Sequence, residues 1–306
     1  MRIAFRIAAL TAATALLAAP AFADEAYVKS VQEWRAKVEQ SLKRDNGWLT
    51  LAGRYVMKPG ENSIGTAKGS DILLPPGVGP ASLGKVIVDG KMIVLKLNDG
   101  IVMKAKEGEF KGERVLTTES SNRDWVSLGR MAFHVIERNG KYVLRLADNE
   151  NEVRKNFAGR VWYDVGDAYK VTGKFVPYAP GKTIQIIDII DEVHDTPAPG
   201  YVEFKLNGQT LRLDATAEPD DKELFIILKD QTAGKGTYNA GRFLVVEWPE
   251  AVRKKGGPVT IDFNKTYNPP CAFSEYTTCP LPPKQNQLKV KLEAGEKYLP
   301  KKIALN

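Results

Sequence analysis

The chain has 306 residues, with 44 Lys and Arg against 37 Asp and Glu, which gives a formal net charge of +7. The basic residues are scattered, and Arg253–Lys255 is the longest run, so no nucleic-acid groove is expected. Two histidines and two cysteines are too few for the usual zinc-hydrolase ligand sets. We therefore expect no cofactor, no metal ion and no nucleic-acid partner.

Residues 1–23 predict a secretory signal peptide. The stretch MRIAFRIAALTAATALLAAPAFA opens with two arginines, continues with a short apolar run and ends in a small-residue A-x-A cleavage site. The run of about 13 apolar residues is too short for the roughly 20 that a transmembrane helix needs. We expect cleavage after Ala23, a periplasmic or secreted protein, and no transmembrane anchor in the mature chain.

Residues 24–46 predict an amphipathic helix. Apolar side chains recur three or four positions apart, at Val28, Val31, Trp34, Val38 and Leu42. Asn46 and Gly47 then end the pattern with residues that typically follow a helix. We expect this helix to lie across the outside of a sheet.

The rest of the chain has the pattern of antiparallel β structure. Asp89–Gly90, Asn139–Gly140 and Asn207–Gly208 each join two apolar-rich runs, and such pairs tolerate the positive φ of tight hairpin turns. Further strands are expected at Phe225–Leu228, Arg242–Trp248, Val259–Phe263 and Leu288–Leu292. The predicted fold is therefore mainly β, with one leading helix.

The region around residue 165 predicts a domain boundary. Residues 162–180 carry no hairpin signal and end at a proline followed by Gly181. A division there gives a β-sandwich over 47–165 and a second β domain over 166–306, each of ordinary domain size. No stretch resembles a flexible linker, so we expect the two halves to pack closely.

The stretch NSIGTAKGSDILLP, from Asn62 to Pro75, resembles the first turn of forkhead-associated domains, which are antiparallel β-sandwiches. In that family an arginine that grips phosphate follows the glycine, and a Ser-x-x-His follows downstream. Here Thr66 stands at the arginine position, and Ser82 is followed by Lys85 where the histidine would be. The resemblance implies the sandwich without phosphothreonine recognition.

The two histidines and two short motifs carry weak signals. His134 lies in an alternating strand and is expected to be an ordinary outward-facing residue, whereas His194 lies in a polar loop with acidic neighbours. PASLG lacks the first glycine of a hydrolase nucleophile turn, and GKGTYNAG lacks the last glycine and the following helix of a dinucleotide-binding loop. Neither motif supports the corresponding chemistry.

The two cysteines lie in the stretch DFNKTYNPPCAFSEYTTCPLPP. Cys271 and Cys279 are too far apart in sequence for a redox motif of the CxxC type, and no histidine lies nearby to complete a zinc site. An isolated pair in an oxidising compartment predicts a disulfide that closes the loop. A metal site and a reactive thiol remain as alternatives.

The strings LFIILKDQTAGKGTYNAGRFLVVE and VTIDFNKTYNPPCAFSEYTTCPLPPKQNQLKVKLEAGEK resemble the bacterial DUF1684 family. The resemblance extends to GWLTLAGRYVMKPGENSIG near the start of the mature chain. It implies no reaction, substrate or cofactor, because the family has no established function. Many members lack export signals yet keep both cysteines, which implies a role for free thiols somewhere in the family.

Two groups of polar residues flank neighbouring predicted strands and could form one pocket, because consecutive antiparallel strands are usually adjacent. The catalytic candidates are Asp230, Tyr238, Arg242 and Asp262, and the candidates for ligand binding are Thr232, Asn264, Tyr267 and Asn268. Arg242 could clamp a carboxylate or phosphate while Asp230 or Asp262 acts as a base. Alternatively, these residues cap turns, and an Arg242–Asp262 ion pair holds the loop.

The leading functional expectation is a periplasmic module that binds a small-molecule or envelope-derived ligand between Asp230–Arg242 and Asp262–Cys279. One alternative is a hydrolase that uses Asp230 or Asp262 with Arg242 and Tyr238. The other is a purely structural protein of the cell envelope.

Overall fold

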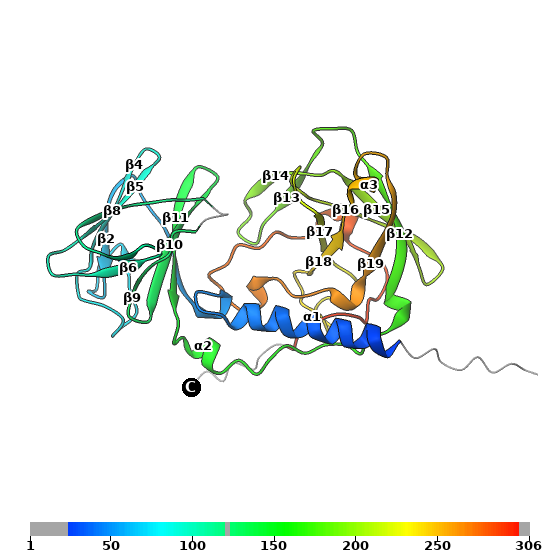
Figure 1. Ribbon diagram of the computed structural model, residues 1–306, viewed down its shortest axis with the longest axis horizontal. Helices are drawn as coiled ribbons and strands as arrows, with labels where there is room; N and C mark the ends of the chain where they lie inside the picture. Colours follow the sequence, from blue (N-terminus) through cyan, green and yellow to red (C-terminus); the bar gives the residue numbers. More distant parts are fainter. Residues whose placement is uncertain (1–23, 120–122, 300–306) are drawn as a thin grey trace, which may run out of the picture.

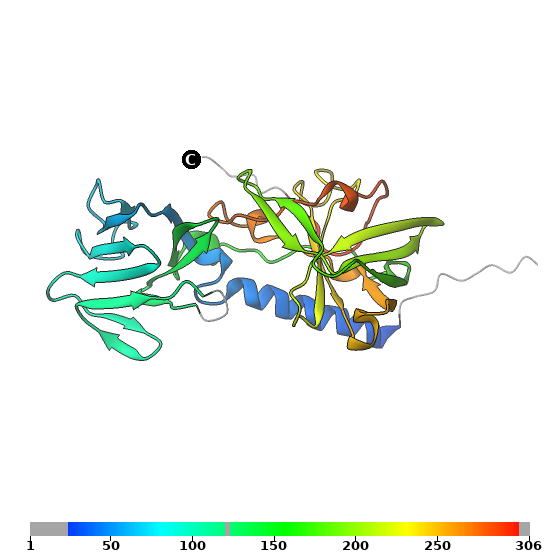
Figure 2. The same cartoon turned by 90° about the horizontal axis from the view of Figure 1, so that it is seen from above.

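A computed structural model describes residues 24–119 and 123–299 and shows a mainly β protein with one long helix, as predicted. Two lobes lie side by side along the long axis of the molecule (Figures 1 and 2). The predicted signal peptide lies outside the described residues. Within them, no helix has both the length and the apolar character that crossing a membrane requires.

Helix α1 (Glu25–Lys43) runs beneath the C-terminal lobe (Figure 1). The Asp24 side chain caps it by accepting a hydrogen bond from the backbone N–H of Ala26. Trp34 packs edge-on against Trp162 and Tyr267, with ring centroids 5.9 and 6.1 Å away. Trp34 is thus held by aromatic residues from two loops.

The N-terminal lobe consists of two sheets that share one hydrophobic core. A six-stranded sheet has the order β1-β11-β10-β9-β6-β7, and a five-stranded sheet has the order β3-β2-β4-β5-β8. The core includes Phe133 and Leu144 from the first sheet and Val86 and Leu95 from the second. The strands are β1 (Leu51–Val56), β2 (Gly60–Gly65), β3 (Ile72–Leu73), β4 (Gly84–Asp89), β5 (Met92–Leu97), β6 (Met103–Ala105), β7 (Gly108–Phe110), β8 (Glu113–Leu116), β9 (Val126–Leu128), β10 (Met131–Arg138) and β11 (Lys141–Asp148).

The three predicted hairpins are confirmed. Asn139 and Gly140 both adopt positive φ, at 48° and 73°, and Asn207 and Gly208 do so at 50° and 75°. These values fit the two-residue turns that match the twist of the flanking strands. At the remaining hairpin, β4–β5, Gly90 supplies the positive φ of 56°.

The C-terminal lobe contains a four-stranded sheet of order β16-β15-β12-β19 and two two-stranded sheets, β13–β14 and β17–β18. The strands are β12 (Lys170–Pro177), β13 (Thr183–Ile187), β14 (Val193–Pro197), β15 (Gly200–Leu206), β16 (Gln209–Ala215), β17 (Glu223–Leu228), β18 (Arg242–Glu247) and β19 (Gly257–Asp262). The short helices of the molecule are η1 (Trp48–Thr50), α2 (Glu152–Lys155), η2 (Asp167–Tyr169), α3 (Glu250–Arg253), η3 (Phe263–Lys265), η4 (Pro270–Ala272) and η5 (Lys284–Asn286).

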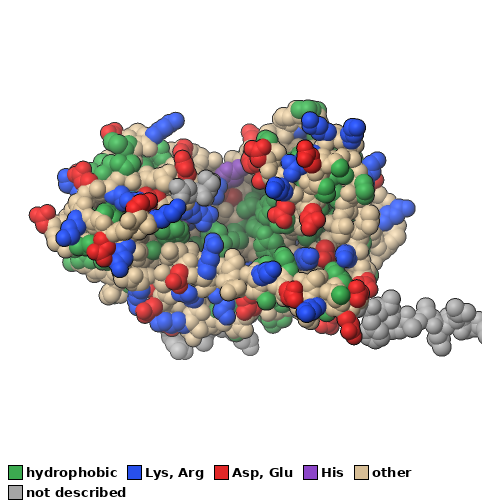
Figure 3. All heavy atoms as spheres, viewed as in Figure 1, with side chains coloured by type: hydrophobic (Ala, Val, Ile, Leu, Met, Phe, Trp, Pro, Cys, Tyr) green, Lys and Arg blue, Asp and Glu red, His purple; other side chains and the backbone are tan. Residues whose placement is uncertain are grey.

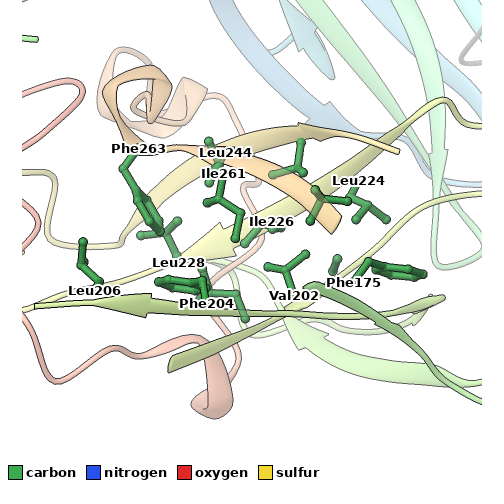
Figure 4. Close-up of a cluster of buried hydrophobic side chains, with 14 of the residues drawn as sticks. Phe175, Val202, Phe204, Leu206, Leu224, Ile226, Leu228, Leu244, Ile261 and Phe263 are labelled. Carbon is green, nitrogen blue, oxygen red and sulfur yellow. The ribbon is translucent and has the colours of Figure 1, made fainter. Parts of the chain in front are cut away.

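The C-terminal lobe has its own core, to which β12, β15, β16, β17, β18 and β19 contribute, and the labelled side chains point toward one another (Figure 4). Phe175, Val202, Ile226 and Ile261 are fully buried there. Burying a side chain of this kind stabilises a fold by about 1.5–3 kcal/mol. Each lobe thus has an apolar core of its own.

The predicted strand at Leu288–Leu292 is wrong, although its alternating pattern has a structural basis. Leu288, Val290 and Leu292 are buried, as alternate residues of a strand would be. The segment nevertheless makes only isolated bonds to its neighbours, and the N–H of Leu292 donates to the Asp230 carboxylate (3.1 Å). At Leu292, side chains satisfy the backbone groups that a β ladder would otherwise pair.

Candidate functional site

Asp230 and Arg242 form a fully buried ion pair behind the β17–β18 loop. Arg242 Nη2 donates to Asp230 Oδ2 at 2.8 Å, and each side chain is 1% exposed. The guanidinium also donates to the carbonyl oxygens of Leu292 and Ala294. Asp230 Oδ1 accepts from the backbone N–H and the hydroxyl of Thr232. These bonds tie residues 292–294 to the loop. The Arg242 guanidinium, which we expected to clamp a ligand, binds acceptors within the protein instead.

Asp262 and Asn264 belong to a second network, which fixes α1 to the end of β19. Asp262 Oδ1 accepts from the Tyr27 hydroxyl (2.8 Å) and from the N–H of Asn264 (3.1 Å). The Asn264 amide donates to the Tyr27 hydroxyl oxygen and to the Gly166 carbonyl oxygen, both at 2.9 Å. Burial and the neighbouring Asp262 carboxylate raise the pKa of the Tyr27 phenol. The ion pair of Asp262 is with Lys265 (3.6 Å), whereas the carboxylate beside Arg242 is Asp230.

The disulfide between Cys271 and Cys279 is formed, as predicted. The loop that it closes is held further by the Tyr238 hydroxyl, which donates to the Cys271 carbonyl oxygen (3.1 Å). Tyr267, just before the loop, pairs through its backbone with Phe243 of β18. Tyr238 and Tyr267 therefore position the cysteine loop, which extends from Pro269 to Pro280.

A cavity of about 910 Å³, here called the interlobe cleft, lies between the N-terminal lobe and the cysteine loop. A cavity of about 270 Å³ shares part of its lining. The surface is hollowed between the lobes, and hydrophobic side chains gather there (Figure 3). Residues of the lining include Trp48, Leu49, Leu51, Phe157, Arg160, Asn268, Cys271, Phe273, Tyr276, Glu296, Tyr298 and Leu299.

A buried ion pair between Arg160 and Glu296 lines the cleft. Their side chains are 5% and 1% exposed. Glu296 Oε2 also accepts from the N–H of Asn268 (2.7 Å), and the Arg160 guanidinium lies 4.8 Å from the centroid of the Phe273 ring. Burial raises the pKa of Glu296 to about 6, against the opposing effect of Arg160. The cleft thus combines an aromatic wall with a buried carboxyl group whose pKa is raised.

Asn268 is the predicted ligand-binding residue that lies in this cleft. It is 2% exposed, and its Nδ2 donates to the Lys297 carbonyl oxygen (2.9 Å). Within residues 24–119 and 123–299, its Oδ1 has no hydrogen-bond partner. A buried unpaired acceptor costs about 1–3 kcal/mol, so a ligand group that donates a hydrogen bond here would be stabilised. Asn268 therefore carries a buried, unpaired hydrogen-bond acceptor among the residues that line the cleft.

A group of acidic and histidine side chains outside the cleft has the spacing of a metal site. The ligand atoms of Asp188, Glu192 and His194 lie within 4.8 Å of one another. Asp188 already contacts His194 Nε2 (3.1 Å) and accepts from the N–H groups of Ile190 and Glu192, while Glu192 lies 3.5 Å from Lys141. These internal bonds account for the arrangement without a metal ion.

Comparison with known proteins relates the half of the chain that contains the cysteine loop to a described family. Residues 155–297 match the model of DUF1684, a protein family of unknown function. The matched region includes Arg160, Asn268, the cysteine loop and Glu296, whereas Trp48 and Leu51 lie outside it. The matched region thus supplies Arg160, Asn268 and Glu296, and the N-terminal lobe supplies part of the apolar wall and further charged side chains such as Arg130 and Asp148.

Among solved structures, the chain is similar to an uncharacterized protein of Haloarcula marismortui that was solved by solution NMR. The two are 29% identical over 47% of this chain and 78% of that chain, with a TM-score of 0.40. No protein among those with curated descriptions matches the chain.

The sequence did not point to Arg160 or Glu296 of the DUF1684 region. They are separated by 136 positions, and both lie in segments without regular strand or helix. The available signal was the end of the family-like string, LEAGEK, where a glutamate follows the alternating apolar residues. In the sequence alone this glutamate is typical of a solvated surface charge, because nothing there indicates that Arg160 lies beside it.

Glu296 predicts a distinctive pH dependence of stability. Its folded-state pKa of about 6 lies above its ordinary value of 4.5, so the folded protein holds this proton more tightly than the unfolded chain does. The contribution to stability is full below about pH 4.5 and is lost as the pH rises through 6, by about 2 kcal/mol. Urea unfolding of wild type and Glu296→Gln at pH 4 and pH 7 measures it as the change in their difference. Wild type should lose stability relative to Glu296→Gln between pH 4 and pH 7. Wild type that gains stability relative to the variant over this range would contradict the raised pKa.

Proposed function

We propose that the protein is an exported ligand-binding protein that holds a small molecule in the interlobe cleft. The observation that carries this proposal is the unpaired Oδ1 of Asn268, buried beside the Arg160–Glu296 pair in a cavity with aromatic walls. Binding cavities typically combine apolar walls with a few polar groups that fix the orientation of the ligand. Export rests on the predicted signal peptide, and the forkhead-associated character of the N-terminal lobe stays a prediction.

The lining favours a ligand that has an apolar face and hydroxyl or amine donors. Phe157 and Phe273 meet edge to face, with centroids 5.9 Å apart, and Tyr298 lies on the same cavity. Asn268 Oδ1 needs a donor, and the charge of Arg160 is already matched by Glu296. Saccharides of the cell envelope have both features, because their C–H faces pack on aromatic rings and their hydroxyl groups donate hydrogen bonds.

A screen of the mature chain, residues 24–306, tests this proposal. Melting temperatures are measured with envelope saccharides, peptides and organic acids. A ligand at 100 times its Kd should stabilise the protein by about 2.7 kcal/mol. Phe157→Ala should weaken binding of any hit by about tenfold or more, since an aromatic contact contributes on the order of 1–1.5 kcal/mol beyond its buried area. Phe110→Ala is the matched control, because Phe110 is also half-buried but lies in the N-terminal sandwich.

Product analysis of each hit separates binding from catalysis. A ligand recovered unchanged after long incubation supports the binding protein. The observation that favours a hydrolase is Glu296, whose raised pKa suits a general acid. If product forms, loss of activity in Glu296→Gln supports catalysis in the cleft, and full activity in this variant supports the hydrolase predicted around Asp230 and Arg242. A screen without a single hit would leave the structural envelope protein as the better account.

A further inference from the structure

The six-stranded sheet carries a row of basic residues on the face that points away from its core. Strand register places Arg54 of β1 opposite Arg145 of β11, and Arg145 opposite His134 of β10. The neighbours of Arg145 in sequence, Leu144 and Leu146, belong to the core. Because side chains alternate along a strand, the three basic residues share the opposite face.

Two members of this row are buried without the partners that buried polar groups normally have. Arg145 is 4% exposed and His134 is 1% exposed. The Arg145 guanidinium lies 5.3 Å from the ring centroid of Trp48, and the His134 ring lies 4.2 Å from that of Trp125. Arg145 Nε and His134 Nδ1 are buried and have no hydrogen-bond partner among the described residues. A buried cation usually needs a counter-charge and hydrogen bonds to be tolerated.

Further arginines lie close enough to the pair for their charges to act on it. We call the set that consists of Arg44, Arg54, Arg123, His134, Arg138 and Arg145 the basic cluster. Burial, then the charges of Arg138, Arg123 and Arg54, lower the pKa of Arg145 to about 10. Within residues 24–119 and 123–299, none of the arginines of the basic cluster forms an ion pair, whereas those at 114, 130, 154, 160, 212 and 242 all do. The cluster therefore has the composition of an anion site whose counter-charge comes from outside the chain.

We propose that the basic cluster binds a small soluble anion that carries a phosphate group. Guanidinium groups bind phosphate oxygens in bidentate fashion, and several of them around one point favour a dianion over a single carboxylate. Burial and the neighbouring Arg123 and Arg145 lower the pKa of His134 to about 3, so its imidazole is neutral and serves as a hydrogen-bonding group. A flat membrane surface would not reach a guanidinium that is 4% exposed, which favours a soluble ligand.

Titration calorimetry and thermal melting of the mature chain test this assignment, with inorganic phosphate and glycerol 3-phosphate as probes. Sodium chloride keeps the ionic strength constant, because general screening alone would change the repulsion among arginines. Arg145→Met should bind both probes about tenfold more weakly or worse. Arg253→Met is the matched control, because the Arg253 guanidinium also lies over a tryptophan, 4.7 Å from the Trp248 ring, without an ion pair. Wild type and this control should melt at higher temperature with phosphate.

Tighter binding of glycerol 3-phosphate than of inorganic phosphate would identify an ester as the ligand, and the reverse would identify free phosphate. Equal loss of binding in Arg145→Met and Arg253→Met would overturn the proposal, as would wild type that binds neither probe at millimolar concentration. Binding to vesicles of phosphatidylglycerol without binding of either soluble probe would also overturn it. If Arg145→Met does not fold, Arg54→Met takes its place. Phe157→Ala should leave phosphate binding intact, so this site and the interlobe cleft succeed or fail separately.

Discussion

Replacing Asp230 by alanine is expected to destabilise the protein by about 3–5 kcal/mol, the cost of leaving a buried charge without its partner. Arg242 would keep its bonds to backbone carbonyl oxygens but would lose the carboxylate 2.8 Å away, at a position where the guanidinium is 1% exposed. Leu292 would also lose the acceptor of its N–H. Urea unfolding at pH 7 measures the loss.

Glu113→Ala is the control for this prediction. Glu113 pairs with Lys96 at 2.6 Å, but both side chains are about half exposed, at 57% and 49%. Exposed ion pairs contribute about 0–1 kcal/mol, so this variant should unfold almost as wild type does. Similar losses for Asp230→Ala and Glu113→Ala would contradict the structural role assigned to the Asp230–Arg242 pair.

Replacing Cys271 and Cys279 together by serine is expected to lower the free energy of unfolding by about 2.5 kcal/mol. The reason is that the disulfide closes a short loop and so reduces the conformational entropy of the unfolded chain. The loop has little regular structure to replace that constraint, since η4 is its single helical turn within the described residues. Because the loop forms one wall of the interlobe cleft, ligand binding in the cleft should weaken as well.

Reductant provides the control for the disulfide prediction. Dithiothreitol should lower the stability of wild type toward that of the double serine variant and leave the variant unchanged. Mass spectrometry of alkylated protein from the cell envelope should find both thiols protected. Two alkylated cysteines, or reductant that leaves wild-type stability unaltered, would contradict a structural disulfide.

The hairpins could be predicted because their determinants are local. Asn139–Gly140 and Asn207–Gly208 favour positive φ through their own covalent structure, and the alternating residues beside them fix which side chains face the core. The Leu288–Leu292 segment has the same alternation without a ladder. The backbone groups of Leu292 bond side chains that lie 50 and 62 positions away, and no local pattern encodes them.

The candidate site was predicted only in part, because its charges pair across long distances in sequence. The sequence suggested that Arg242 meets a carboxylate but not that Asp230, rather than Asp262, is the one. Arg160 and Glu296 were not predicted, since neither belongs to a regular element and they are 136 positions apart. The basic cluster looked scattered along the chain, although the turn at Asn139–Gly140 already implies a register that sets His134 beside Arg145.

The crystal structure of the mature protein with the best ligand from the saccharide, peptide and organic-acid screen tests the central claim most directly. We predict that the ligand lies in the interlobe cleft, against Phe157 and Phe273, and donates a hydrogen bond to Asn268 Oδ1. A ligand bound instead beside Asp230 and Arg242, or outside the cleft altogether, would contradict this account.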